Sequence, residues 1–243
     1  MTISLTAVLL ASTVVLVGSA VQGSVGFGLS LFAAPFLVLI DPTLVPVPIN
    51  VVSLVFNALV VGRERGRAHW QAVSWPIAGL VPGGVAGAAA LAALSGHEDV
   101  LTIALGSLIL LAVALSIVGV HPQRRPATLL AAGTLGSFMN TTVGIGGPPL
   151  ALVLQHSSGP ELRGVLSRYF LVAQVVSLLV LAAWGQVHTT EVWAGLALVP
   201  AAVIGFAGSS LLTGRVDRGR VRTAVLVISA ATALLAIVRA VVA

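Results

Sequence analysis

The chain contains no cysteine and no lysine, and charged residues make up only 8% of its 243 residues. Without cysteine there are no disulfide bonds, thiolate metal sites or cysteine nucleophiles. All 12 basic residues are arginines, and they form short clusters between apolar runs. This distribution is typical of loops between membrane segments and not of a continuous nucleic-acid-binding face, so we expect no nucleic-acid partner.

The sequence also lacks the motifs of an intramembrane enzyme. Ser24 is a candidate nucleophile, but no histidine or carboxylate lies deep in an apolar run to act as its base. There is no His-Glu-x-x-His pair for zinc and no glycine-rich lysine loop for a nucleotide phosphate. We therefore predict that the chain is not an enzyme and that it needs no metal or cofactor.

Apolar residues dominate what is present: 58% of the chain is hydrophobic, and the mean hydropathy is +1.10. This composition lies outside that of soluble domains and predicts a protein surrounded by lipid. Glycine, proline and charged residues divide the chain into ten apolar runs. The runs span residues 4–21, 26–40, 43–61, 72–94, 99–119, 127–139, 144–156, 161–184, 190–212 and 220–242.

Some of these runs are too short for a membrane-spanning helix, which needs about 20 apolar residues. Runs 127–139 and 144–156 fall short of this length, and run 26–40 is marginal. Two short helices joined by a polar, glycine-rich tip predict a re-entrant hairpin, whose irregular backbone has to be surrounded by protein or water. The first run lacks the preceding basic residues of a cleaved secretory signal, so we treat it as the first arm of such a hairpin.

The chain repeats itself with a constant shift of 118 residues. The matches include residue types that rarely pair by chance in this composition, namely Pro42 with Pro160, Trp75 with Trp193, Pro82 with Pro200, and Asp99 with Asp217. We therefore expect an all-α polytopic membrane protein whose single integrated transmembrane domain consists of two inverted repeats. Repeat 1 covers 1–119 (hairpin 4–40, helices 43–119) and repeat 2 covers 120–243 (hairpin 127–156, helices 161–242), each with one re-entrant, broken-helix hairpin and three transmembrane helices.

Loop charges predict the orientation of these repeats. If each hairpin makes no net crossing, the basic loops all fall on one side, and the loops with acidic residues fall on the other. Basic loops stay in the cytoplasm, so both termini are predicted on the outer side, and the odd number of crossings in each repeat makes the two repeats inverted. The basic loops are those near residues 63–67, 124–125, 163 and 215–222, and the acidic positions are Asp41, Glu98, Asp99 and Glu191.

Inversion is expected to bring the two hairpin tips, Gln22–Gly28 and Asn140–Pro148, together near the middle of the membrane. Secondary transporters commonly build substrate sites from broken helices at that depth. The backbone N–H groups that start each second arm would attract an anion, glycines permit close approach of a ligand, and amides and hydroxyls contact its oxygen atoms. The candidate substrate-binding residues are Gln22, Gly23, Ser24, Gly26, Gly28, Asn50, Asn57, Asn140, Thr141, Thr142, Gly144, Gly146, Gly147 and Arg168.

Two stretches, GSVGFGLSLFAAPFLVLIDP in the first half and VGIGGPPLALVLQHSSGP in the second, resemble the sulfite exporter TauE/SafE family of membrane transporters. The resemblance implies a multi-pass protein of the bacterial cytoplasmic membrane that moves small sulfur-containing anions or organosulfonates. A carrier working by alternating access and an anion channel of the same architecture both fit this pattern. The expected partners are a small inorganic or organic anion and the lipid bilayer. The sequence leaves the coupling ion, the direction of transport and the oligomeric state open.

Arg168 departs from the usual appearance of that family, together with Tyr169 beside it. It lies seven residues into the run that starts at Glu161, about 10 Å along a helix, and its repeat partner is Asn50. An arginine at this depth either faces a cavity or extends back to the headgroups, and the sequence favours neither. Weaker candidates are Asn57, Gln174 and Ser177, each of which is more simply explained by a hydrogen bond between helices.

Overall fold

A computed structural model describes residues 4–25, 28–63, 73–94, 96–118, 122–155, 159–212 and 218–242. These residues form eleven α-helices and one short 3-10 helix, and no strand occurs among them, which confirms the predicted all-α class. The first half contains α1 (Leu5–Val25), α2 (Leu29–Ile40), η1 (Pro42–Leu44), α3 (Val47–Arg63), α4 (Ser74–Ala78), α5 (Leu80–Leu94) and α6 (Glu98–Ile117). The second half contains α7 (Pro126–Val143), α8 (Gly147–Val153), α9 (Gly159–Ala183), α10 (Thr189–Leu212) and α11 (Arg218–Val242).

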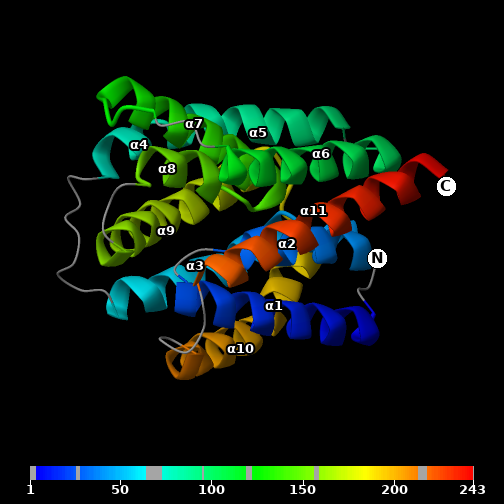
Figure 1. Cartoon of the computed structure of the whole chain (residues 1–243). Coiled ribbons are helices and arrows are strands. Elements are labelled where there is room, and N and C mark those ends of the chain that lie inside the picture. The colour runs from blue at the N-terminus through cyan, green and yellow to red at the C-terminus, as the bar shows by residue number, and fades with distance from the viewer. Residues whose placement is uncertain are drawn as a thin grey trace.

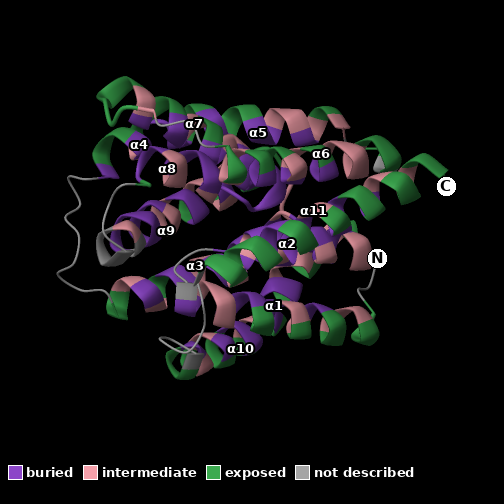
Figure 2. Ribbon diagram, viewed as in Figure 1, coloured by how far each residue is buried: buried purple, intermediate pink, exposed green. Residues whose placement is uncertain are grey.

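Seven segments of the described chain are long and apolar enough to cross a membrane, so the protein is a multi-pass membrane protein. They are 5–24, 42–63, 74–94, 99–117, 164–183, 189–211 and 219–242. Exposed leucine, valine and isoleucine side chains are frequent on these helices, as expected of surfaces that face lipid. Figure 2 shows such exposed stretches along α1, α10 and α11, with buried residues where the helices meet.

The two helices that follow the polar tips are short. Helix α2 has 12 residues and α8 has seven. The helices before the tips are longer than predicted, because α1 continues to Val25 and α7 continues to Val143. Helix α7 therefore ends four residues beyond the apolar run 127–139 that predicted it.

Two polar residues near the tips, Ser24 and Thr142, have side chains that bond within their own helix. The Ser24 hydroxyl donates to the carbonyl of Ala20 at 2.9 Å, and the Thr142 hydroxyl donates to that of Phe138 at 2.9 Å. Such bonds let serine and threonine sit inside an apolar helix without unwinding it. Among the described residues of the two tips, Gly28 and Gly144 have positive φ angles, 122° and 72°, which glycine adopts without strain.

Contacts between helices recur when the halves are exchanged. Helix α1 packs on α10 as α7 packs on α5, and α2 packs on α11 as α8 packs on α6. Helix α3 contacts α10 as α9 contacts α5, while α3 with α9 and α6 with α11 pair across the halves. The start of α1 and the end of α11 lie at one end of the molecule, and the end of α3 lies at the other (Figure 1).

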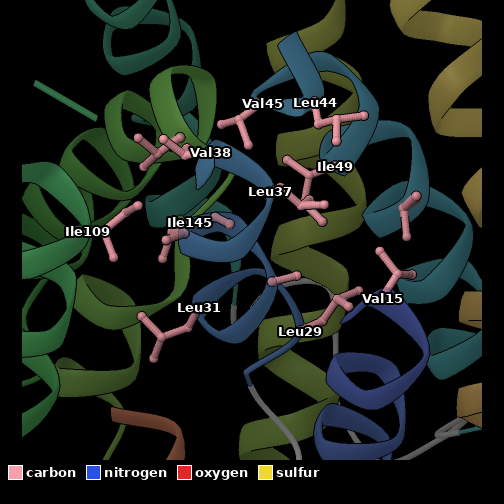
Figure 3. Close-up of a cluster of buried hydrophobic side chains, with 14 of the residues drawn as sticks. Val15, Leu29, Leu31, Leu37, Val38, Leu44, Val45, Ile49, Ile109 and Ile145 are labelled. Atoms are coloured by element: carbon pink, nitrogen blue, oxygen red, sulfur yellow. The ribbon is translucent and has the colours of Figure 1, made fainter. Parts of the chain in front are cut away.

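The main hydrophobic core surrounds α2. Seven of its 12 residues are buried, and its neighbours are α1, α3, α6 and α11. Figure 3 shows Leu29, Leu37 and Val38 of this helix within the cluster, close to Ile49 of α3 and to Ile145. Protein therefore encloses a helix that is too short to cross a bilayer, which meets the condition for broken helices at membrane depth.

Candidate functional site

A cavity of about 380 Å³ lies where two pairs of helices meet, α1 with α2 and α7 with α8. We call these the two broken-helix pairs. Both halves contribute to its wall: α1, α2, α3 and the end of α6 from the first, and α7, α8, α9 and the start of α11 from the second. Its polar lining residues are Gln22, Ser30, Ser53, Asn57, Ser116, Asn140, Gln155, Gln174 and Arg222.

The structure brings seven of the predicted site residues to this wall. They are Gln22, Gly28, Asn57, Asn140, Gly144, Gly146 and Gly147. It places six others away from the wall, namely Gly23, Ser24, Asn50, Thr141, Thr142 and Arg168. Gly26 lies outside the described residues.

At the first tip, the side chain of Gln22 closes the gap between α1 and α2. Its Oε1 accepts the backbone N–H of Leu29 at 2.7 Å and so caps the first turn of α2. This bond fixes the amide with its oxygen towards the helix, which leaves Nε2 to donate elsewhere. The N–H groups of Ser30 and Leu31 belong to the same first turn, have no acceptor within the helix, and come from residues that line the cavity.

At the second tip, the backbone turns sharply and packs on the preceding helix. Gly144 adopts the left-handed conformation and donates its N–H to the carbonyl of Asn140 at 2.9 Å. A side chain at Gly146 would meet the carbonyl oxygen of Gly136 at 2.8 Å, so the close approach of these two segments requires glycine.

The start of α8 provides few hydrogen-bond donors. Pro148 and Pro149 occupy the second and third positions of this seven-residue helix and carry no N–H. Fewer backbone donors are therefore available to an anion at the start of α8 than at the start of α2. The start of α2 has no proline in its first turn and keeps these donors.

Asn140 joins α7 to α9 through a buried network. Its Nδ2 donates to Gln174 Oε1 at 2.6 Å and to Ser177 Oγ at 2.9 Å. The Ser177 hydroxyl also lies 2.8 Å from that of Thr141, which places Thr141 in the network although it does not reach the cavity. Asn50 of α3 donates to the carbonyl of Asn140 at 3.3 Å and so links the two halves.

A second group of polar side chains lies on α2 and α3, and the sequence predicted only one of its members. The hydroxyls of Ser30 and Ser53 lie 3.2 Å apart, and Asn57 Nδ2 donates to the carbonyl of Ser53 at 2.7 Å. The Oδ1 of Asn57 is buried and has no hydrogen-bond partner among the described residues. Asn57 was predicted, but Ser30 and Ser53 were not; the only sequence signal for Ser53 is its position one turn before Asn57 on the same helical face.

One end of the cavity reaches exposed residues at the end of α6 and the start of α11. Val118 is exposed, and so is Arg222, whose guanidinium donates to the carbonyl of Ser116 at 2.5 Å. Arg222 is the only ionisable side chain among the lining residues that the structure describes. In the sequence it was counted only as one of the loop charges that set the orientation.

Gly23 has a packing role instead of a place on the wall. A Cβ at this position would overlap the side chain of Ser209 on α10. Its carbonyl accepts a hydrogen bond from Arg63 at 3.0 Å, and the same guanidinium lies 4.5 Å from the ring centre of Phe206. Arg63 therefore joins the ends of α1, α3 and α10.

Arg168 is buried within α9, with 5% of its surface exposed. Its guanidinium donates to the carbonyl of Gly164 at 3.0 Å, one turn closer to the start of the same helix. The next residue, Tyr169, is fully buried and donates its hydroxyl to the carbonyl of Gly133 on α7 at 2.9 Å. Neither residue lines the cavity.

Comparison with known proteins covers nearly the whole chain. Residues 10–236 match the model of the family described as sulfite exporter TauE/SafE, a family of membrane transporters. Comparison with curated proteins and with solved structures gives no match for this chain. The family match extends over both broken-helix pairs and the helices that enclose the cavity, and the chain therefore belongs to the sulfite exporter TauE/SafE family.

Proposed function

We propose that the protein is a secondary transporter of a small anion, a sulfur oxyanion or organosulfonate such as sulfite, in the bacterial cytoplasmic membrane. The family description names sulfite export, which supplies the substrate class. The observation that carries the proposal is the cavity of about 380 Å³ between the two broken-helix pairs. Its volume lies within the range of about 300–1,000 Å³ that is usual for small-molecule sites.

The proposed architecture is a pair of inverted repeats, each with one broken-helix hairpin. The contacts that recur when the halves are exchanged support this arrangement, because a two-fold relation between repeats requires them. Substrate sites of such carriers lie at the repeat interface, and alternating access moves one repeat or bundle against the other around the site. The position of the cavity between both halves agrees with this mechanism.

The lining residues supply donors that suit an anion. They are Gln22 Nε2 and the backbone N–H groups of Ser30 and Leu31, which follow Gly28 at the start of α2. A helix start carries a positive partial charge that stabilises negative ligands. Arg222 at the exposed end adds a full positive charge, which raises the local concentration of anions in the mouth of the cavity.

The exposed end of the cavity is proposed to face the cytoplasm. Arg222 lies near the start of α11, and other arginines lie at the end of α3 and the start of α7, in agreement with the rule that basic loops remain cytoplasmic. Both termini then lie on the outer side. In this orientation the cavity represents the inward-open state of the carrier.

Flux into vesicles tests the proposal. Liposomes that contain the purified protein are loaded with unlabelled sulfite, thiosulfate, sulfate or a small sulfonate. Entry of the ³⁵S-labelled anion is then measured and compared with entry into protein-free liposomes. We expect saturable uptake that is accelerated by the same unlabelled anion on the other side. Conductance without saturation or exchange would indicate a channel, and absence of any anion flux would contradict both forms of the proposal.

A further inference from the structure

We propose that the cavity also binds a monovalent cation, with Na⁺ as the probe, at the oxygen atoms of Ser30, Ser53 and Asn57. The inference rests on the proposed function, because it assigns the coupling ion of that transporter. It differs from the expectation that Asn57 binds the anion. The reason is the orientation of the Asn57 amide.

The Asn57 amide has one orientation that its neighbours permit. Nδ2 lies 2.7 Å from the carbonyl oxygen of Ser53, which accepts hydrogen bonds and cannot donate them. Exchanging the amide nitrogen and oxygen would place two acceptors against each other. The oxygen is therefore held away from Ser53, in a residue that lines the cavity and is 2% exposed.

Within the part of the chain that the structure describes, the Oδ1 atom of Asn57 has no hydrogen-bond partner. Leaving a buried acceptor unpaired is unfavourable, and a ligand that supplies positive charge or a hydrogen-bond donor relieves this cost. A fully deprotonated oxyanion cannot do so, because its oxygen atoms accept hydrogen bonds, as the amide oxygen does. We therefore assign this atom to a cation and not to the anion.

Two further side-chain oxygens belong to residues that line the same cavity as Asn57. The Ser30 and Ser53 hydroxyls are 3.2 Å apart, so one donates to the other and lone pairs remain available. Ser53 and Asn57 are separated by one turn and share a face of α3, while Ser30 comes from the first turn of α2, and all three residues line the cavity. Neutral hydroxyl and amide oxygens without a carboxylate suit a monovalent cation better than a divalent one.

The described lining residues give a proton no carrier. Among the lining residues that the structure describes, Arg222 alone ionises, and a guanidinium stays protonated in proteins. A cation at Asn57 would instead offset the charge of an anion held near Gln22 and the start of α2. Linkage then requires that Na⁺ tighten anion binding and that the anion tighten Na⁺ binding by the same factor.

Direct binding of ²²Na⁺ to the purified protein tests the site without relying on transport. Wild-type protein in detergent is titrated in choline buffer, first alone and then with sulfite. We expect saturable binding that excess unlabelled Na⁺ displaces and that sulfite tightens. Asn57→Leu should weaken ²²Na⁺ binding by about tenfold or more, since even outer partners of bound metals contribute about 10–100-fold. Ser53→Ala should weaken it less. The control is Ser167→Ala, at a buried serine of α9 that does not line the cavity, and it should leave ²²Na⁺ binding unchanged.

The outcomes separate this inference from the proposed function. Anion flux by a wild-type protein that shows no saturable ²²Na⁺ binding would overturn the cation site and leave the transporter standing. Binding of ²²Na⁺ without any anion flux would contradict the transporter instead. If Asn57→Leu does not give a monodisperse protein, Ser53→Ala decides the location, and unchanged ²²Na⁺ affinity in that variant would overturn it.

Discussion

The two broken-helix tips occupy equivalent positions in the sequence repeat, but their side chains do different things. Gln22 and Asn140 are both amides and are separated by the repeat shift of 118 residues. Gln22 reaches forward and caps the helix that follows it. Asn140, which is one methylene shorter, bonds sideways to Gln174 and Ser177 of α9. The repeat preserves the amide, and the length of the side chain selects its partner.

The helices after the tips differ as well. Helix α2 has 12 residues, and its first turn keeps the backbone donors of Ser30 and Leu31, which line the cavity. Helix α8 has seven residues and begins with a glycine followed by two prolines. The proposed anion donors therefore come mainly from the first half. The second half contributes shape, through the turn at Gly144, and a rigid connection to α9. In the proposed transporter, this difference between the tips gives the anion one preferred position.

The largest effect is expected from Gly144→Val at the second tip. The backbone φ of 72° is unfavourable for valine, and its Cβ would overlap the side chain of Ile49. Strain of this kind costs about 1–3 kcal/mol before the clash is counted. We expect anion flux to fall to the level of protein-free liposomes while the protein still inserts in the membrane. Gly208→Ala on α10, where an added Cβ meets no neighbour, is the control; wild-type flux in Gly144→Val would contradict the importance of this turn.

Asn140→Leu is expected to have the next largest effect, because it removes the sideways connection of the second tip. Gln174 would lose its buried donor, at a cost of about 1–3 kcal/mol. The apparent Tm in detergent should fall, and flux should fall with it. Thr134→Val is a matched change on α7, since Thr134 bonds only to the carbonyl of its own helix one turn earlier. An equal loss of Tm in both variants would show that the network adds no particular stability.

Gln22→Asn gives the first tip the amide of the second and so tests the comparison directly. The shorter side chain cannot reach the N–H of Leu29, and loss of a helix cap costs about 1 kcal/mol. We expect a smaller fall in Tm than for Asn140→Leu and a higher apparent KM for the anion, measured by the same vesicle flux. Thr13→Val, on an exposed part of α1, should change neither value. An unchanged KM in Gln22→Asn would contradict a role of this amide in anion binding.

The sequence was sufficient to predict the all-helical membrane fold and part of the cavity wall. Gln22, Asn140 and Gly144 stood out because amides and clustered glycines are unusual between apolar runs. Ser30 and Ser53 did not stand out, because serine is common in apolar helices, where it usually bonds to the backbone of its own helix. Their role depends on the packing of α2 against α3, which has no local signal.

The ends of the helices were also harder to predict, because the partners of polar side chains cannot be read from the sequence. The polar residues from Asn140 to Thr142 were expected to be unwound, but their side chains find partners within α7 or on α9. Polarity alone therefore does not mark a break in a membrane helix, whereas a glycine with positive φ does. Arg222 was missed as a lining residue because nothing in a basic cluster indicates which arginine faces a cavity.

The smallest effect on transport is expected from Arg168→Gln, in the position of the second half that corresponds to Asn50 in the first. Asn50 connects the halves through the carbonyl of Asn140, whereas Arg168 bonds back to Gly164 in its own helix and does not line the cavity. A hydrogen bond inside a membrane protein is worth about 0.6 kcal/mol, and glutamine can retain one donor to Gly164. We expect an apparent KM within about twofold of wild type, because Arg168 does not line the cavity. If Arg168 held the anion, its loss would remove a binding contact and raise KM. A KM raised well beyond that would mean that the guanidinium leaves Gly164 during the transport cycle and reaches the anion, which would shift part of the charge recognition from the first half to the second.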